Sequence, residues 1–239
     1  MPDAMTDRPV GLVVRSRNPE QAFATTRSYA SPVPSGVAKV GKRCVDVVIS
    51  FIALVCMAPL FLAIVIAIKL DSRGPAFYVH ARVGSHGKPL PVMKFRTMVV
   101  DAEETLRDLL ARRPEQKRLW DTAFKLRDDP RITRVGRLLR RFSMDELPQL
   151  VNVLRGEMSL VGPRPVVEEE LQRFGSSAAI ILCAVPGITG LWAVSGRSDI
   201  SYDERVELEC RYVTDWSLRL DLSILVRTIP VVLRGRGSY

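Results

Sequence analysis

Histidine and cysteine are scarce in this chain of 239 residues, which has two histidines and four cysteines. His80 and His86 are too few for a histidine-based zinc site. The cysteines form no Cys-x-x-Cys motif, and a chain with 47% hydrophobic residues can bury a core without disulfides, so we expect a reduced, cytosolic environment. The balance of hydrophobic and charged residues also excludes collagen-like, coiled-coil and wholly disordered chains.

Acidic residues are outnumbered, with 26 Asp and Glu against 35 Lys and Arg and a net charge of +9. Such an excess predicts an anionic partner, which can be nucleic acid, a phosphorylated small molecule or a lipid surface. Residues 107–141 contribute +7 of this charge. Nucleic acid is not expected as a partner, because Trp120 and Phe124 are the only aromatic residues in that segment that could stack on bases.

Long hydrophobic runs are limited to residues 47–68, in which Ser50 is the only clearly polar residue. As one helix this run is about 33 Å long, enough for a bilayer core of about 30 Å. Pro59, however, lies near its middle and predicts a break in the helix. Each half is then about 18 Å long and too short to cross alone.

Basic residues flank this run on both sides, and basic residues mark the cytoplasmic side of a membrane. The pattern predicts a re-entrant helix–break–helix over residues 38–72, with both ends cytoplasmic. A single kinked transmembrane helix is the alternative. A buried helix of a soluble protein is less favoured, because the run is apolar on every face. The flanking cations are Arg27, Lys39, Lys42 and Arg43 before the run and Lys69, Arg73, Arg82 and Lys88 after it.

The remaining chain predicts an α+β, mostly helical fold with a few short strands. Residues 1–37 are polar, interrupted by prolines and without a secretory signal, so we expect a flexible segment. Residues 73–239 are expected to form a catalytic domain on one side of the membrane. We expect strands at 76–83 and 91–95 around a turn at 84–89, helices at 101–113, 166–174 and 201–216, and a surface amphipathic segment at 217–233 interrupted by Pro230.

Asp145 and Glu146 are adjacent acidic residues that follow three arginines closely. One interpretation is structural, because Ser143 and Glu146 have the spacing of a capping box at a helix start. The other is chemical: the arginines would lower the pKa values of both carboxylates and keep them ionised, as a nucleophile or a metal ligand must be. Pro148 predicts an irregular, exposed backbone here.

Further basic residues stand in motifs that suit phosphate binding. Arg164 lies between two prolines that would present it rigidly, unless it is merely a solvated loop residue. Lys94 and Arg96 share one face of a strand, as a phosphate-facing pair or a membrane-proximal basic edge. Arg197 ends a glycine-containing loop whose Trp192 could stack on a base or belong to the core. Carboxylates and arginines without a histidine base favour transfer of phosphorylated groups.

Four motifs in order resemble the bacterial sugar transferase family, the monotopic polyprenyl-phosphate phosphoglycosyl transferases. They are KFRTM at 94–98, SMDELPQL at 143–150, GEMSLVGPRP at 156–165 and PGITGLW at 186–192. The resemblance runs from about Lys39 to the C-terminus, and the segment at 215–225 is similar to exopolysaccharide-initiating, hexose-1-phosphate members. It implies an enzyme of the bacterial inner membrane, with its catalytic domain on the cytoplasmic face.

The resemblance also implies a mechanism. Asp145 would attack the sugar-bearing phosphate of a UDP-sugar (UDP-galactose or UDP-glucose), release UMP and form a covalent aspartyl-phosphosugar, which undecaprenyl phosphate then accepts. Glu146, with Asp145 beside it, would hold Mg²⁺. Arg140 and Arg164 would bind phosphates, and Pro59 would break the membrane helix. The sequence leaves a homodimeric state open.

The chain departs from the family pattern at four positions, which are Ala58, Met144, Glu157 and Ala193. Ala193, where glutamine is usual, removes one hydrogen-bonding group from the Trp192 loop. Two alternatives from other functional classes remain at this point. One is a membrane-anchored binder of nucleic acid or anionic lipid without catalysis. The other is a glycosidase, which adjacent Asp145 and Glu146 suit poorly because such chemistry separates its carboxyls by about 5 Å or more.

Overall fold

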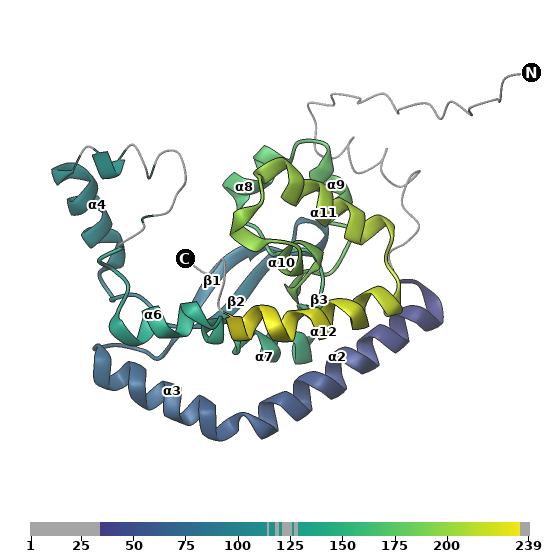
Figure 1. Cartoon of the computed structure of the whole chain (residues 1–239), viewed down its shortest axis with the longest axis horizontal. Coiled ribbons are helices and arrows are strands. Elements are labelled where there is room, and N and C mark those ends of the chain that lie inside the picture. Colours follow the sequence, from purple (N-terminus) through teal and green to yellow (C-terminus); the bar gives the residue numbers. More distant parts are fainter. Residues whose placement is uncertain (1–33, 114, 118–119, 121–125, 127–128, 235–239) are drawn as a thin grey trace, which may run out of the picture.

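In the computed structural model, which describes residues 34–113, 115–117, 120, 126 and 129–234, two apolar helices come first (Figure 1). Helix α2 is Gly36–Cys56 and helix α3 is Ala58–Asp71, and the pair is bent by 62°. Pro59 lies in the first turn of α3, where its missing N–H leaves no intrahelical bond unmade. The predicted break is therefore confirmed, with Met57 as the residue between the helices.

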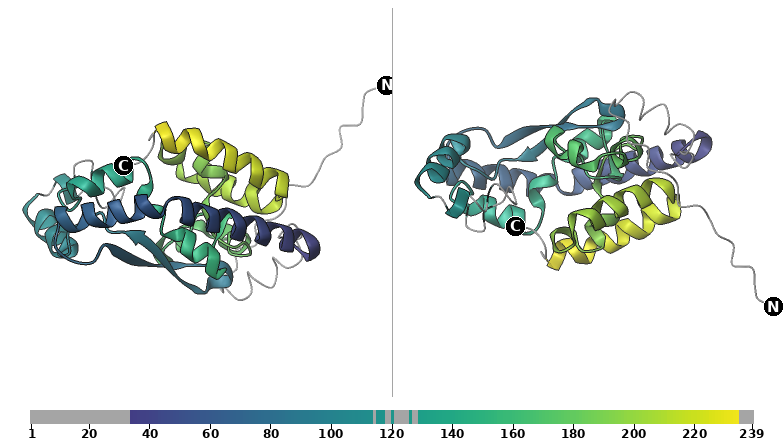
Figure 2. Two further views of the ribbon diagram at one scale, coloured as in Figure 1. Left: turned by 90° about the horizontal axis from the view of Figure 1, so that it is seen from below. Right: turned by 90° about the horizontal axis from the view of Figure 1, so that it is seen from above.

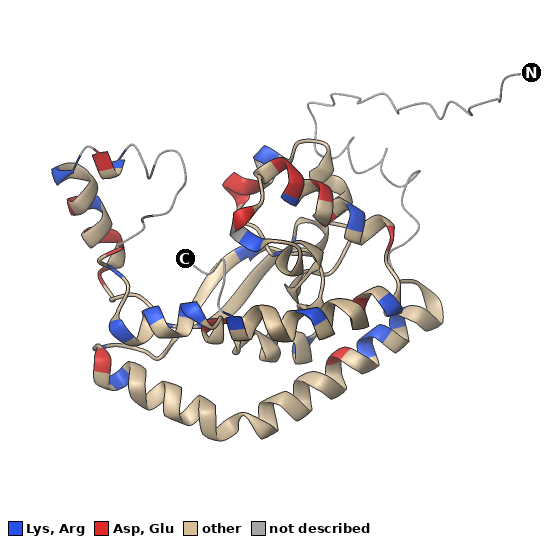
Figure 3. Ribbon diagram, viewed as in Figure 1, with Lys and Arg blue, Asp and Glu red and all other residues tan. Residues whose placement is uncertain are grey.

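The middle of this helix pair exposes its apolar side chains. No single helix in the described residues is long and apolar enough to cross a membrane, whereas α2 and α3 together pass by length and composition. Charged residues of the pair lie toward its two outer ends (Figure 3). This exposure argues against a buried helix of a soluble protein. The side chains that are at least half exposed include Val48, Phe51, Ile52, Val55, Leu62 and Ile66.

A β-hairpin follows the helix pair. Strand β1, Phe77–Val83, pairs antiparallel with β2, Pro89–Phe95, in a register that places Phe77 opposite Phe95 and Val83 opposite Pro89. A single turn of 3₁₀ helix, Ser85–Gly87, lies in the connection. Both predicted strands and their turn are confirmed, and β2 begins two residues earlier than expected.

The rest of the domain is mainly helical, which confirms the predicted α+β, mostly helical class. Strands β3 (Ser159–Val161) and β4 (Gly187–Thr189) form a two-stranded parallel sheet that the sequence did not predict. Three expected helices are confirmed, with ends within two residues of prediction, as α4, α8 and α11. The helices are α4 (Ala102–Arg112), α6 (Arg134–Arg141), α7 (Gln149–Arg155), α8 (Glu168–Phe174), α9 (Ser177–Ile181), α10 (Leu191–Val194), α11 (Tyr202–Thr214) and α12 (Leu218–Arg234).

Helix α12 continues through Pro230, so the predicted interruption is wrong. A proline removes one backbone hydrogen bond, yet the helix runs on to Arg234 beyond it. Helix α12 packs on β3, β4, α10 and α2. One face of α12 is exposed and apolar, as expected for a surface amphipathic helix. Its exposed apolar residues are Leu218, Leu222, Val226, Ile229 and Leu233.

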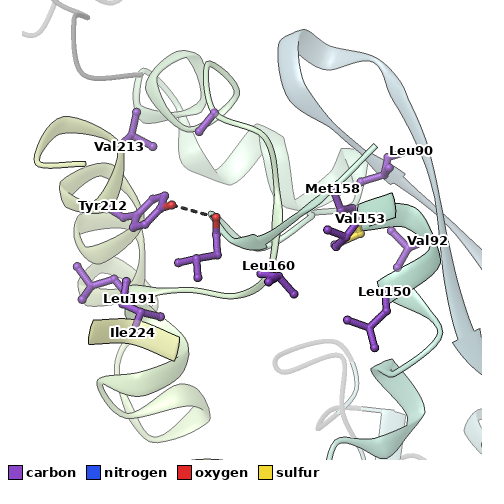
Figure 4. Packing of buried hydrophobic residues seen from close by; sticks show 12 residues of the cluster. Leu90, Val92, Leu150, Val153, Met158, Leu160, Leu191, Tyr212, Val213 and Ile224 are labelled. Carbon is purple, nitrogen blue, oxygen red and sulfur yellow. Dashed lines mark hydrogen bonds between the residues drawn. The ribbon is translucent and has the colours of Figure 1, made fainter. Parts of the chain in front are cut away.

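The main hydrophobic core lies between α7, β3, α11 and α12 (Figure 4). The Tyr212 hydroxyl, on α11, lies 2.9 Å from the Val161 carbonyl oxygen of β3 and 2.8 Å from the Asp221 carboxylate of α12, two acceptors that share its one hydrogen. A second cluster, with Ile68 of α3 and Phe95 of β2, attaches α3 to the hairpin and α6. The apolar helix pair is thus packed onto the domain at its α3 end.

The α2 end is attached by buried polar contacts. The Lys42 ammonium lies 2.6 Å from the Asp221 carboxylate of α12, and Arg43 donates to main-chain carbonyls of α7. The Asp46 carboxylate accepts from the Ser159 hydroxyl of β3 at 2.8 Å. Two of the flanking cations used to predict the cytoplasmic side therefore bind the protein's own domain.

Candidate active site

The acidic pair lies in a single turn of 3₁₀ helix, Met144–Glu146, between α6 and α7. Ser143 enters this turn with a positive φ of 54°, and its side chain makes no capping hydrogen bond. The capping-box interpretation is therefore wrong: helix α7 begins at Gln149, five residues later than a cap at Ser143 predicts. The irregular backbone predicted from Pro148 is confirmed, although Asp145 and Glu146 are half-buried rather than exposed.

Glu146 is surrounded by cations. The Lys94 ammonium, on β2, donates to its carboxylate at 2.7 Å. Burial alone would raise the pKa of Glu146, but the charges of Lys94, Arg164 and Arg197 lower that pKa to about 2. Glu146 is therefore ionised throughout the physiological range.

The pKa of Asp145 is shifted in the opposite direction, upward. Burial, and then the neighbouring Glu146 charge, raise the pKa of Asp145, while Lys94 and Arg140 act against that rise. The prediction that cations lower the pKa of both carboxylates is right for Glu146 and wrong for Asp145, because desolvation outweighs the cations there. A less stabilised carboxylate is the more basic and more nucleophilic of the two.

Arg140 faces Asp145 from the end of α6. Burial lowers the pKa of Arg140, and the Asp145 charge raises it. Its Nε donates to the Thr97 hydroxyl at 2.9 Å. Gly136 lets α6 approach this closely, because a Cβ at that position would lie 2.1 Å from the Thr97 carbonyl oxygen. Thr97 was not predicted, although it belongs to the KFRTM motif that supplied Lys94.

Arg164 is held by contacts on both its main chain and its side chain. Its N–H donates to the Glu209 carboxylate of α11 at 3.1 Å. Its guanidinium lies 5.3 Å from the centre of the Trp192 ring, and that of Arg205 lies 5.0 Å from the same ring. Trp192 is thus a half-buried partner of arginines beside the site, and neither a core residue nor a free stacking platform. Glu209 and Arg205 were missed because neither belongs to a motif.

A pocket brings three of the predicted site residues together with Trp192, whereas Asp145, Arg140 and Arg197 are not among its lining residues. Lys94, Glu146, Arg164 and Trp192 line one small cavity between the hairpin and the β4 segment. Arg197 is close enough for the Glu146 charge to raise its pKa against the lowering effect of burial. The cavity is also lined by Gln149, Ile188 and Thr189, which the sequence did not single out, and by Arg82, which it named only as a flanking cation.

Arg96 does not join this group. Its guanidinium donates to the Ser72 carbonyl and the Ser72 hydroxyl, each at 2.9 Å, and to the Arg73 carbonyl. These contacts close the end of α3 against β2. Lys94 and Arg96 are therefore not one phosphate-facing pair: Lys94 contacts the acidic turn, whereas Arg96 holds the chain that follows α3.

The acidic pair is the feature that suits a divalent metal. Within the part of the chain that the structure describes, no cluster of three or more potential ligands among His, Cys, Asp and Glu occurs. Mg²⁺ does not need one, because it is commonly held by one or two carboxylates and completes its shell with water and substrate phosphate oxygens. Asp145 and Glu146 match that donor set.

Two adjacent carboxylates with opposed pKa shifts, Glu146 in a pocket lined by cations and Asp145 beside it, define a site for group transfer between anionic substrates. The chain belongs to the bacterial sugar transferase family, whose family model matches residues 37–235. The family predicted from the four motifs is thereby confirmed.

Relatives with assigned names support this membership. The chain is 44% identical over 220 residues to the exopolysaccharide production protein ExoY of Sinorhizobium fredii, covering 90% of this chain and 97% of that protein. It is 50% identical over 198 residues to the undecaprenyl-phosphate galactose phosphotransferase of Salmonella typhimurium, covering 83% of this chain but 41% of that protein. It is 37% identical over 243 residues to the UDP-glucose:undecaprenyl-phosphate glucose-1-phosphate transferase of Caulobacter vibrioides, covering 98% of this chain and 83% of that protein.

Membership in a family of transferases argues against the two other functional classes, a binder without catalysis and a glycosidase. The two aromatic residues considered for base stacking, Trp120 and Phe124, give no support to a binder of nucleic acid. Arg131 lies 5.1 Å from the centre of the Trp120 ring. Phe124 lies outside the described residues.

Proposed function

We propose that this protein transfers hexose 1-phosphate from a UDP-sugar to undecaprenyl phosphate and releases UMP, as the first membrane step of exopolysaccharide repeat-unit synthesis. The names of the Salmonella and Caulobacter relatives support the acceptor and the type of group transferred. Those names include both galactose and glucose, so either UDP-galactose or UDP-glucose is the proposed donor. The observation on which the proposal rests most is the acidic turn, with Asp145 and Glu146 in opposed environments.

Asp145 is the proposed nucleophile. Its carboxylate oxygen forms a bond to the phosphorus that bears the sugar, and the bond from that phosphorus to the bridging oxygen of the diphosphate breaks, so that UMP leaves. An oxygen of undecaprenyl phosphate then attacks the same phosphorus and frees Asp145. The raised pKa of Asp145 supports this assignment over Glu146, whose pKa of about 2 makes it the weaker nucleophile.

The surrounding cations offset the repulsion between a carboxylate and two phosphate substrates. Arg140 is positioned beside Asp145, whereas Lys94, Arg164 and Arg197 lie on the Glu146 side. We assign Mg²⁺ to Glu146, with Asp145 beside it. When bound there, the ion supplies charge neutralisation for the phosphate oxygens.

We also propose that α2 and α3 form a re-entrant membrane helix and that the domain lies on the cytoplasmic face of the inner membrane. Both ends of the pair bind the same domain: Lys42 contacts Asp221 at one end, and the Asp71 carboxylate accepts from the Val135 N–H of α6 at the other. A single domain that holds both ends supports entry and exit on one side. The exposed apolar residues lie between those ends.

The test is UMP release by the full chain in nanodiscs with undecaprenyl phosphate and UDP-galactose or UDP-glucose in turn. We expect sustained release that requires lipid acceptor and Mg²⁺, stops on chelation and is absent in Asp145→Asn. The better donor identifies the sugar. Absence of release from every UDP-sugar by folded protein would overturn the proposed function.

A further inference from the structure

Arg82 is a basic residue of the pocket that none of the four motifs includes. It lies on β1, half-buried, and lines the same cavity as Lys94, Glu146 and Arg164. The hairpin register explains its place, since His80 stands opposite Val92 and Arg82 opposite Leu90. Residues directly opposite in an antiparallel pair share a face, so Arg82 lies on the face of the hairpin from which Lys94 reaches the acidic turn.

The pocket has more positive than negative charge. The Lys94 ammonium lies 2.7 Å from the Glu146 carboxylate. Glu146 is the one acidic residue among the described residues that line the pocket. Arg82 and Arg164 remain without an ion-pair partner among those residues. Burial, and then the nearby Arg164, lower the pKa of Arg82 to about 10, which means that its charged form is poorly stabilised there. An anion with more than one charge would relieve this imbalance.

His80 fixes the guanidinium of Arg82. The Arg82 Nη2 lies 3.3 Å from the Nδ1 of His80, on the same strand. Burial, followed by the charges of Arg82, Lys94 and Arg164, lowers the pKa of His80 to about 4, so the imidazole is neutral at physiological pH. Its Nδ1 can then accept from Arg82. This contact leaves the remaining N–H groups of the guanidinium for a ligand.

We propose that Arg82 is a binding residue for the diphosphate of the nucleotide-sugar donor, and that His80 is the positioning residue that orients it. Lys94, Arg82 and Arg164 then form a cationic cradle across the pocket, in which a guanidinium fork can bind two phosphate oxygens. This inference rests on the proposed function. The inference extends the proposed function by a contact to the donor from β1, a strand outside the four sequence motifs.

The experiment measures donor binding rather than turnover. The full chain is prepared in nanodiscs with Asp145→Asn, so that a UDP-hexose is bound without being consumed, and calorimetry gives the dissociation constant at several salt concentrations. Adding Arg82→Ala is expected to weaken UDP-hexose binding about 10- to 100-fold and to reduce its salt dependence. Arg82→Lys, which retains the charge without the fork, should give a smaller loss. Arg112→Ala, which removes an exposed arginine of α4, should leave binding unchanged.

His80 is tested by two substitutions in the same background. His80→Phe removes the acceptor and should weaken donor binding several-fold, whereas His80→Asn, which offers an amide oxygen near Nδ1, should restore most of it. Equal affinity in the parent, Arg82→Ala and Arg82→Lys proteins would overturn the inference and leave the proposed function standing. Failure of the parent itself to bind any UDP-hexose would overturn both.

Discussion

At the scale of single residues, the acidic turn shows what neighbours in space add to neighbours in sequence. Asp145 and Glu146 were identifiable from their motif, and the irregular backbone from Pro148. The difference between their pKa shifts was not, because it depends on Lys94, 52 positions from Glu146, and on unequal desolvation. Side-chain partners this distant leave no pattern in a single sequence.

Thr97 is expected to orient Arg140 for catalysis. Thr97→Val has nearly the same shape but no hydrogen-bond acceptor, so the Nε–H of Arg140 loses its partner. Because Arg140 is half-buried, this loss costs about 1–3 kcal/mol. We expect kcat to fall by about tenfold or more, with little change in the melting temperature. Thr97→Ser keeps the hydroxyl and should retain activity. Equal kcat in the Val and Ser variants would contradict this role.

Glu209 should make stability depend on pH. Burial raises its pKa from 4.5 to about 7, and its second carboxylate oxygen has no hydrogen-bond partner. Because the folded state then binds a proton that the unfolded state has released, the free energy of unfolding falls as pH rises from 4.5 to 7, by up to about 3 kcal/mol. Glu209→Gln still offers an oxygen to the Arg164 N–H and should flatten this decline.

Melting temperatures measured between pH 5 and 8 test this expectation. Glu207→Gln, an exposed substitution on the same helix, is the control and should leave the pH profile of the wild type unchanged. A Glu209→Gln profile parallel to that of the wild type would show that Glu209 is ionised across this range.

At the scale of elements, the sequence predicted what periodicity and proline determine. It predicted the hairpin, helices α4, α8 and α11, and the break between α2 and α3. It missed the β3–β4 sheet, because three-residue strands are too short to show alternation. It also predicted an interruption at Pro230, whereas α12 continues through that residue to Arg234.

The packing of α6 on the hairpin end should depend on Gly136. Gly136→Ala would place a Cβ 2.1 Å from the Thr97 carbonyl oxygen, so α6 has to move. We expect a loss of about 1–3 kcal/mol in stability and a larger relative loss in kcat, because α6 positions Arg140. Gly41→Ala is the control, since its Cβ would meet no atom within 4 Å. Unfolding experiments together with UMP release check both effects, and wild-type kcat in Gly136→Ala would contradict the coupling.

At the scale of the whole molecule, the helix pair and the domain form one unit. The flanking charges, taken from the sequence as signs of the cytoplasmic side, turn out to include Lys42, which binds Asp221 within the protein. Asp221 also accepts from Tyr212 and Trp216, so one buried carboxylate joins α2, α11 and α12. Such a network could not be derived from the sequence, because its members come from three separate segments.

Cysteine labelling tests the proposed membrane arrangement. In a background whose native cysteines are replaced by serine, a cysteine at Lys39 and one at Arg73 should both react with an impermeant maleimide from the cytoplasmic side only. Native Cys56, retained alone beside the bend, should be protected by lipid although it is exposed in the protein itself. Reaction of the two flanking positions from opposite sides would indicate a single span.

The central claim is that Asp145 carries the phosphosugar between donor and acceptor, and single-turnover labelling tests it most directly. The protein in nanodiscs without acceptor is mixed with Mg²⁺ and a donor labelled in its sugar ring, and the protein is then digested and sequenced by mass spectrometry. We predict one equivalent of UMP, a phosphosugar on Asp145, transfer of the label to lipid when undecaprenyl phosphate is added, and no label in Asp145→Asn. An active enzyme that never retains label, and that releases UMP only when the acceptor is present, would contradict this account.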